Sequence, residues 1–181
     1  MSLSNAPRPA APRLLGAIIA GGRATRFAGD KGAALLDGTA LIDHAAAAIA
    51  PFVDHVIVCG RDWPGIESVV DRPAPDLGPL GGIAAALHHA RGHDAVLTIG
   101  CDMPIVPPAL IAVLVAGGSR YCVQAPILAC WDAALAAEID AHIGRGGSLS
   151  IRGWADVAGA RAVAWDAPLA NVNTRADLAA L

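Results

Sequence analysis

The sequence predicts an α/β protein built on a doubly wound, mostly parallel β-sheet. An unbroken apolar run at residues 14–20 is typical of a strand that is covered on both faces. Strand-like apolar runs then alternate with segments of helical periodicity along the chain. A glycine-rich loop at residues 21–31 follows the first strand, and in such sheets ligands bind beyond the carboxyl ends of the strands.

The first half of the chain predicts two helices and three further strands. Residues 39–49 carry apolar side chains on one helical face and end just before Pro51. Residues 80–90 are predicted as a second helix because Gly78 and Pro79 precede them. Strands are predicted at residues 55–59, 67–70 and 95–99.

The second half continues this alternation around a glycine-rich break at residues 144–147. Prolines in the first turn favour a helix at residues 107–116. Thr174 begins a final helix, with Asp177 in the N3 position of a capping box. Helices are also predicted at residues 131–142 and 149–156, and strands at residues 121–125 and 161–165.

Length and composition indicate one globular domain. The chain has 181 residues, of which 55% are hydrophobic and 16% charged, and we expect a single domain at residues 14–181. Residues 1–13 are rich in proline and alanine and lack the apolar core of a signal peptide, so we expect a disordered lead-in and a cytoplasmic location. The four cysteines show no C-x-x-C spacing and are interpreted as buried thiols.

Charge and hydropathy exclude two classes of partner. The net charge of −3 argues against a nucleic-acid or membrane-surface binder, which needs a basic face. The longest uncharged stretch, residues 103–119, contains prolines and a glycine pair and cannot form a membrane-spanning helix. We therefore expect neither nucleic acid nor membrane as a partner.

The loop after the first strand carries two cations, Arg26 and Lys31. The adjacent glycines Gly21 and Gly22 let backbone N–H groups approach anionic oxygens closely. The loop lacks the Walker A pattern, because Lys31 does not directly follow Gly29, and it lacks the third glycine of the dinucleotide fingerprint. We interpret it as a phosphate loop of a third kind; the alternative is an ordinary turn with solvated cations.

Asp102 lies just beyond the predicted strand at residues 95–99. Mg²⁺ takes hard oxygen ligands, usually one or two carboxylates with water and substrate phosphates. A carboxylate at the mouth of the sheet, near Arg26 and Lys31, suits that chemistry, so we predict that Asp102 is a Mg²⁺ ligand. The alternative is that it caps the turn before Pro104.

Two further sets of residues are candidates for ligand binding. Asp71 can accept hydrogen bonds from a base, and Gly81 and Gly82 at a helix start allow a close approach to a ribose or base. A helix-entry turn and close packing are the alternative for the glycines. Asn171 and Asn173 alternate along an extended stretch and so point to one side, toward the cleft; ordinary turn asparagines are the alternative.

Three histidines, His88, His89 and His93, lie near the end of a predicted helix. Cations suit a helix C-terminus, and the H-E-x-x-H spacing of a zinc site is absent from the sequence. We expect solvated histidines here, not a metal cluster.

Several of these motifs resemble one family. Residues 20–31 are similar to the A-G-G-x-S-x-R-M-G-x-D-K signature of nucleotidyltransferases, most closely the molybdenum cofactor guanylyltransferases, the MobA family. Residues 71–83, 101–104 and 171–174 resemble its D-x(6)-G-P-L-x-G-[IM], C-D-x-P and N-[VI]-N-T segments. The chain departs from the family at Ala24, Phe27 and Ala28, and at Cys59, where the family commonly has an asparagine.

The resemblance implies a Rossmann-like nucleotidyltransferase fold and transfer of GMP from GTP to molybdopterin carrying molybdenum, with release of pyrophosphate. It implies Mg²⁺ as cofactor, with Asp102 as its ligand, and catalysis by Arg26, Lys31 and Asp102. It assigns Asn171 and Asn173 to the acceptor side, and nucleotide binding to Ile19, Ala20, Gly21, Gly22, Lys31, Cys59, Asp71, Gly81 and Gly82.

The implied partners are GTP and molybdopterin, with transient contacts to other molybdenum cofactor proteins. Two alternatives stay open. One is a sister enzyme, such as a cytidylyltransferase acting on molybdopterin or another small phosphorylated acceptor. The other is a nucleotide-binding regulator without turnover, favoured by the departures at Ala24 and Ala28.

Overall fold

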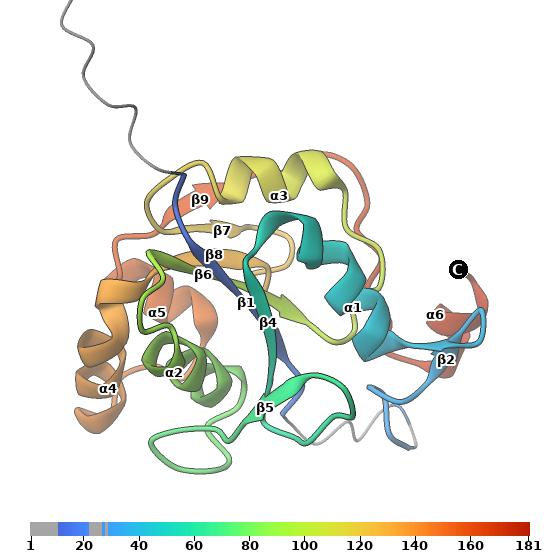
Figure 1. Ribbon diagram of the computed structural model, residues 1–181, viewed down its shortest axis with the longest axis horizontal. Coiled ribbons are helices and arrows are strands. Elements are labelled where there is room, and N and C mark those ends of the chain that lie inside the picture. Colours follow the sequence, from blue (N-terminus) through green and yellow to red (C-terminus); the bar gives the residue numbers. More distant parts are fainter. Residues whose placement is uncertain (1–10, 22–26, 28) are drawn as a thin grey trace, which may run out of the picture.

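The computed structural model describes residues 11–21, 27 and 29–181. Within these residues a sheet of seven strands has the order β5-β4-β1-β6-β8-β7-β9, with helices on both faces (Figure 1). The predicted doubly wound, mostly parallel fold is confirmed. The strands are β1 (Leu14–Ile19), β4 (His55–Cys59), β5 (Glu67–Val69), β6 (Ala95–Gly100), β7 (Arg120–Cys122), β8 (Ala129–Asp132) and β9 (Arg161–Val163). The helices are α1 (Leu41–Ile49), α2 (Pro79–His89), α3 (Pro108–Leu114), α4 (Ala136–Gly144), α5 (Ile151–Val157) and α6 (Arg175–Ala179), with short 3-10 helices η1 (Ala50–Phe52) and η2 (Ala133–Leu135).

The strand β1 lies at the centre of the molecule, and all six of its residues are buried. It pairs in parallel with β4 on one side and β6 on the other. Because side chains alternate between the faces of a strand, Leu15 and Ile19 join the core that contains α2, whereas Ile18 joins the core that contains α1 and α3. A strand covered on both faces needs apolar residues throughout, which explains the unbroken run at residues 14–20.

The strand order reverses between β1 and β6, and this reversal predicts where a ligand-binding site lies. Strands β4 and β5 extend the sheet from one side of β1, and the chain then crosses through α2 to β6 on its other side. The backbone N–H of Cys101 donates to the carbonyl of Ile19 across a distance of 3.3 Å, so the two strand ends lie together. Ligands of open α/β sheets bind at such a reversal, outside the carboxyl ends of the strands.

The strand β8 corrects one prediction. We expected a helix at residues 131–142, but Trp131 lies in β8, which runs antiparallel between β6 and β7. Trp131 is fully buried against Trp154, with ring centroids 6.2 Å apart, and its Nε1–H donates to Thr98 Oγ1 across 3.1 Å. The helical turns begin only after Asp132, whose side chain accepts a hydrogen bond from the backbone N–H of Ala134. Pairing with a distant strand has overridden the helix propensity of the neighbouring alanines.

Other boundaries differ from the predictions more modestly. The predicted helix at residues 39–49 begins at Leu41, because β2 (Leu35–Leu36) and β3 (Thr39–Ala40) form a small antiparallel hairpin before it. The strand predicted at residues 121–125 ends at Cys122, and the one predicted at residues 161–165 ends at Val163. The capping box of the last helix is confirmed, with Thr174 and Asp177 bonded reciprocally.

The described residues include no helix that is both long and apolar enough to cross a membrane. Cys59, Cys122 and Cys130 are buried thiols, as expected, and Cys101 is partly exposed; none of these four forms a disulfide. Burial raises the pKa of the Cys59 thiol to about 12, with a smaller contribution from the Asp71 carboxylate. Ahead of β1, residues 1–10 of the expected lead-in lie outside the described residues, while the backbone N–H of Arg13 donates to the Asp94 carboxylate across 2.7 Å.

Candidate active site

A cavity of about 540 Å³ opens at the carboxyl ends of β1 and β6. We call it the Lys31 cavity. Its lining includes five residues singled out from the sequence: Ile19, Ala20, Gly21, Lys31 and Asp102. Arg26, which we also predicted at this place, lies outside the described residues. The structure therefore brings the end of the glycine-bearing strand, the lysine and the carboxylate to one place.

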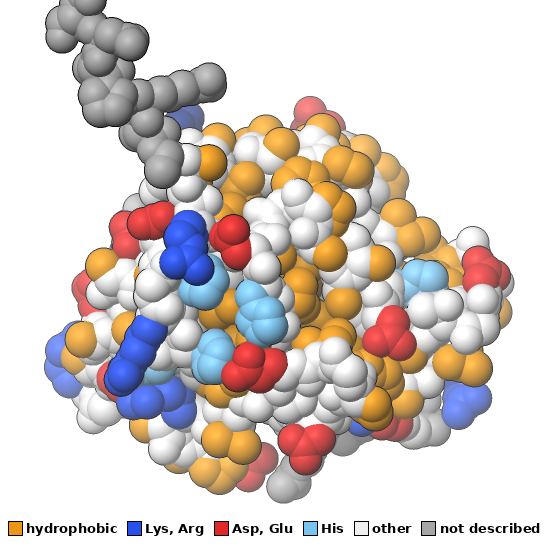
Figure 2. Space-filling view, in the orientation of Figure 1, with side chains coloured by type: hydrophobic (Ala, Val, Ile, Leu, Met, Phe, Trp, Pro, Cys, Tyr) orange, Lys and Arg blue, Asp and Glu red, His pale blue; other side chains and the backbone are white. Residues whose placement is uncertain are grey.

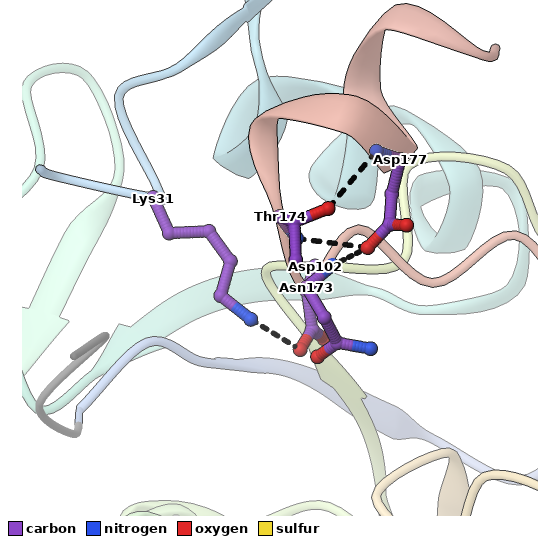
Figure 3. A network of polar contacts seen from close by, with 5 residues as sticks. All are labelled: Lys31, Asp102, Asn173, Thr174 and Asp177. Carbon is purple, nitrogen blue, oxygen red and sulfur yellow. Dashed lines mark hydrogen bonds and ion pairs between the residues drawn. The ribbon is translucent and has the colours of Figure 1, made fainter. Parts of the chain in front are cut away.

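Lys31 and Asp102 form an ion pair at the bottom of this cavity (Figure 3). The Lys31 Nζ donates to Asp102 Oδ2 across 2.9 Å, and the two side chains are 17% and 24% exposed. Gly100 provides the space for this carboxylate, since a Cβ at that position would collide with Asp102 Oδ1. The pair is partly shielded from water, so its charges interact more strongly than those of a surface pair.

The donor set around Asp102 suits a hard divalent cation that is shared with a ligand. No group of three or more His, Cys, Asp or Glu side chains among the described residues is arranged to hold a metal by itself. Mg²⁺ does not need such a cage, because it is commonly bound by one or two carboxylates together with water and phosphate oxygens. Asn173 follows Val172, whose backbone N–H is bonded to the Asp102 carbonyl, and its side chain overlaps that of Asp102 in the view of Figure 3.

A second ion pair borders the Lys31 cavity and joins Asp30 to Arg61. The Arg61 Nη1 and Nη2 groups donate to the two Asp30 carboxylate oxygens across 2.5 and 2.6 Å, which is the bidentate geometry of a strong charge-assisted pair. The hydrogen bonds from Arg61 hold the pKa of the Asp30 carboxyl below its ordinary value. The guanidinium also lies 5.3 Å from the ring centroid of Trp63, whose Nε1–H donates to Asp43 across 2.7 Å.

A neighbouring cavity of about 620 Å³ lies beyond the ends of β4 and β5, and we call it the Asp71 cavity. It shares Gly21 and Arg61 with the Lys31 cavity, so the two are adjacent. Its other walls include Gly60, Asp62, Val69, Val70, Asp71 and Pro75.

Asp71 contributes an unused acceptor to this second cavity. Its Oδ1 atom is buried and has no hydrogen-bond partner among the described residues. Burial raises the pKa of the Asp71 carboxyl. A buried polar atom that is left unpaired costs folding free energy, and such atoms are commonly satisfied by a ligand or an ordered water.

Two glycines make this arrangement possible. A Cβ on Gly60 would lie 2.5 Å from the Cα of Gly21, and a Cβ on Gly21 would lie 2.8 Å from Asp71 Oδ2. Gly60 also has a φ of 87°, which other residues rarely adopt. The backbones after β1 and β4 therefore touch, and the Asp71 carboxylate packs directly against them.

Three predicted nucleotide-binding residues lie outside the walls of both cavities. The Cys59 side chain is fully buried in the core at the end of β4. Gly81 and Gly82 lie inside α2, where an added Cβ would lie 3.2 Å from Asp71 Cβ and 3.0 Å from Ile19 Cγ2 respectively. These glycines thus allow α2 to pack closely behind Asp71 and β1; a direct ligand contact of these residues stays a prediction. Gly22 lies outside the described residues.

The segment before the last helix is bonded to Asp102 but is not among the residues that line the Lys31 cavity. The backbone N–H of Val172 donates to the Asp102 carbonyl across 2.8 Å, and the Val172 side chain is fully buried with Phe27 and Leu41. Asn171 and Asn173, on either side of it, are exposed, as expected for alternation along an extended strand. Of the two, Asn173 lies next to Asp102 in Figure 3.

The structure adds site residues that sequence reasoning missed. Arg61 follows β4 by two residues, and the rule that selected Asp102, a polar residue just after a parallel strand, also selects Arg61. Ile127 and Ile151 line the Lys31 cavity from the turn between β7 and β8 and from the start of α5. An isolated isoleucine carries no sequence signal of this kind, because it is more often a core residue.

The histidines near the end of α2 form ion pairs and are not simply solvated, as we had expected. His88 lies 2.9 Å from Asp140, and His89 lies 3.3 Å from Glu67, which also contacts His55 at 3.0 Å. Figure 2 shows histidine side chains gathered beside acidic ones on this face of the molecule. These pairs lie away from the residues that line the two cavities.

A mostly parallel sheet with adjacent cavities at its carboxyl edge is typical of enzymes that bind nucleotides, and the chain is an enzyme of the nucleotidyltransferase class. Sequence comparison identifies the branch. The family model described as MobA-like NTP transferase domain matches residues 16–157, so the chain belongs to this family.

Two curated relatives carry the name molybdenum cofactor guanylyltransferase. One from Ralstonia nicotianae is 32% identical over 193 residues, which cover 91% of this chain and 94% of that protein. One from Burkholderia orbicola is 38% identical over 117 residues, which cover 59% of this chain and 57% of that protein. A crystal structure of molybdopterin-guanine dinucleotide biosynthesis protein A from Archaeoglobus fulgidus has a TM-score of 0.71 at 21% identity and covers 92% of this chain and 95% of that one.

Proposed function

We propose that the protein transfers GMP from GTP to molybdopterin carrying molybdenum, releasing pyrophosphate and forming the guanine dinucleotide cofactor. The carrying observation is the pair of adjacent cavities, one with the free Asp71 acceptor and the other with Lys31 and Asp102. Guanine presents two N–H donors on one edge, which match a carboxylate acceptor. The named relatives support the same reaction.

In this proposal the chain acts mainly by positioning and by neutralising charge. The acceptor phosphate, already an anion, attacks the α-phosphorus of GTP, the bond between the α-phosphorus and its bridging oxygen to the β-phosphorus breaks, and pyrophosphate leaves. No general base is needed. The Lys31 ammonium leaves Asp102 for the phosphate oxygens and stabilises the charge that develops on them.

Asp102 and the neighbouring Asn173 are the described residues that would hold Mg²⁺. When bound, Mg²⁺ supplies positive charge beside the phosphates. We assign Arg26 and the backbone of Gly22 to the phosphates as well, on the resemblance of their loop to the family signature. Backbone groups at Gly60, which lines the Asp71 cavity, can serve where Cys59 replaces the family asparagine.

The acceptor enters the Lys31 cavity from the side formed by the second half of the chain. Ile127 and Ile151 make an apolar wall there, suited to the flat ring system of a pterin. We assign Asn171 and Asn173 to the acceptor, because they flank Val172, which is bonded to the Asp102 carbonyl.

The test measures pyrophosphate release with each of the four ribonucleoside triphosphates, with Mg²⁺, in the presence and absence of molybdopterin. We expect release with GTP that depends on both Mg²⁺ and molybdopterin, and its loss in Asp102→Ala. A preference for CTP would instead identify a cytidylyltransferase. Tight GTP binding without release would identify a regulator.

Two further expectations accompany this function. A cytoplasmic location and transient contacts with other proteins of molybdenum cofactor assembly fit an enzyme that receives and hands on a labile pterin. A single domain at residues 14–181 fits the way in which the final segment, through Val172, returns to Asp102.

A further inference from the structure

Among the described residues, Arg61 and Gly21 line both cavities. Asp71 lines only the second cavity, and Lys31 and Asp102 line only the first. A nucleotide that places its base at Asp71 and its outer phosphates near Lys31 must therefore extend past Arg61. The part of the nucleotide next to Arg61 is the part between the base and the outer phosphates. That part consists of the ribose and the α-phosphate.

The guanidinium is oriented in advance of any ligand. Two of its five N–H groups are bonded to Asp30, and its face lies over Trp63, which is itself fixed by hydrogen bonds from its ring N–H to Asp43 and from its backbone N–H to Ser68. Arg61 is 28% exposed, so part of its hydration has already been removed. Fixing a cation in this way lowers the entropic and solvation cost of binding an anion later.

The N–H group on Nε is a further donor of this oriented guanidinium, beyond the two that are bonded to Asp30. The Nε atom of Arg61 is buried and has no hydrogen-bond partner among the described residues. Arginine residues that are oriented by a carboxylate commonly direct their remaining donors at an oxyanion, because the planar guanidinium matches phosphate geometry. The ribose is a poorer partner for this cation, and its hydroxyl groups are better matched by the Asp62 carboxylate of the second cavity.

We propose that Arg61 binds a non-bridging oxygen of the nucleotide α-phosphate, the phosphate at which transfer occurs, and that Asp30 holds Arg61 in position for it. This inference rests on the proposed nucleotidyl transfer but concerns a contact that binding alone can report. It makes Arg61 a catalytic residue and Asp30 a positioning residue.

The test compares GMP with guanosine, which differ only by the α-phosphate. Equilibrium dissociation constants for both ligands are measured by calorimetry with the full chain and with Arg61→Ala. We expect Arg61→Ala to weaken GMP binding by about 10-fold to 100-fold, the effect of losing one charge-assisted hydrogen bond, and to change guanosine binding less than about twofold. Equal losses for both ligands, or no loss for either, would overturn the proposal.

The matched control is Asp30→Asn, which removes the charge that orients Arg61 but keeps its donors. If Arg61 contacts the α-phosphate and Asp30 positions it, Asp30→Asn weakens GMP binding, though less than Arg61→Ala does, and leaves guanosine binding nearly unchanged. If Arg61 only anchors the loop at Asp30, both variants lose the same affinity for both ligands, which contradicts the proposal. Thermal unfolding of each variant checks the fold, and Arg61→Lys, which keeps a charge, is expected to recover part of the GMP affinity.

A stereochemical experiment extends the test to turnover. The two diastereomers of guanosine 5′-(α-thio)triphosphate place sulfur on one or the other non-bridging α-oxygen. We expect Arg61→Ala to slow GTP turnover by about 100-fold or more and to slow one diastereomer far less than the other. Equal slowing of both would overturn the contact. Absence of turnover in the unchanged protein would defeat the proposed function, while the GMP and guanosine comparison would still decide the role of Arg61.

Discussion

The two cavities differ in whether their carboxylates are paired with a cation. In the Lys31 cavity each described carboxylate has a cation of its own, since Asp102 is bonded to Lys31 and Asp30 to Arg61. In the Asp71 cavity the Asp71 carboxylate keeps a buried oxygen that has no partner among the described residues.

This difference separates the tasks of the two cavities. A polyanion that enters the Lys31 cavity must compete with carboxylates for the cations, so binding there rearranges existing bonds and prepares the charge distribution for reaction. A base that enters the Asp71 cavity can bond to a carboxylate oxygen without displacing another described residue from it. We therefore expect substitutions in the first cavity to change turnover and substitutions in the second to change which base is accepted.

The largest expected effect comes from Lys31→Ala. This change removes the ammonium that would stabilise the phosphates and leaves Asp102 without its ion-pair partner. We expect turnover of GTP to fall by about 1,000-fold or more, with a thermal midpoint within a few degrees of the unchanged protein. Pyrophosphate release and thermal unfolding measure the two effects. Arg91→Ala, an exposed residue outside both cavities, is the matched control, and near-normal turnover in Lys31→Ala would erase the contrast between the cavities.

A smaller and more selective effect is expected from Asp71→Asn. The amide retains one acceptor but loses the charge, so it should bind the N1–H and N2–H groups of guanine less well. We expect kcat/KM for GTP to fall by about 10-fold to 100-fold and the preference for GTP over ITP, which lacks the N2 amino group, to shrink. Competition between the two nucleotides measures this preference. A variant with unchanged base preference would show that Asp71 does not contact the base.

The same substitution should slightly stabilise the free protein. Because burial raises the pKa of Asp71 in the folded state, ionisation is less favourable there than in the unfolded chain. The protonated Asp71 carboxyl therefore favours the folded state below its unfolded-state pKa, and this stability is lost as pH rises through its folded-state pKa. At neutral pH the ionised carboxylate lowers the free energy of unfolding. We expect Asp71→Asn to raise the thermal midpoint at pH 7 by about 1–3 °C and to have little effect near pH 3. A lower midpoint at pH 7 would mean that the carboxylate is stabilised by groups other than those described.

The smallest effect concerns Cys59, which lies directly behind the Asp71 cavity. The Cys59 thiol is fully buried, and its raised pKa of about 12 leaves very little thiolate at neutral pH. We expect no alkylation by iodoacetamide at pH 8 over several hours in the folded protein, and rapid alkylation in denaturant. Mass spectrometry of peptides reports both, and fast labelling of the native protein would show that the end of β4 opens to solvent.

The features that could be predicted from the sequence depend on residues that are near one another in the chain. The apolar run of β1, the loop that bears Lys31, the strand-end Asp102 and the capping box at Thr174 depend on residues that are close together in the chain. Local periodicity and turn chemistry therefore suffice to predict them.

The rest depends on partners that are distant in the chain. The antiparallel placement of β8 follows from its pairing with β6 and from the bond between Trp131 and Thr98, which no local pattern encodes. Arg61 acquires its position only when Asp30, Trp63 and the two strand ends have come together. Gly81 and Gly82 allow α2 to pack closely behind Asp71 and β1, which depends on neighbours distant in the chain, and their direct contact with a ligand stays a prediction.

The hydrogen bond from Val172 to the Asp102 carbonyl joins residues that are 70 positions apart. The ribosome delivers Asp102 long before Val172, and the segment that flanks Asp102 on this side arrives within the last ten residues of the chain. A nascent chain can thus complete β1, β4 and β6 while the Asp102 carbonyl still lacks the partner that Val172 provides. The backbone of Asp102 is therefore fixed late in synthesis, and a chain that stops before Val172 would leave that carbonyl unpaired.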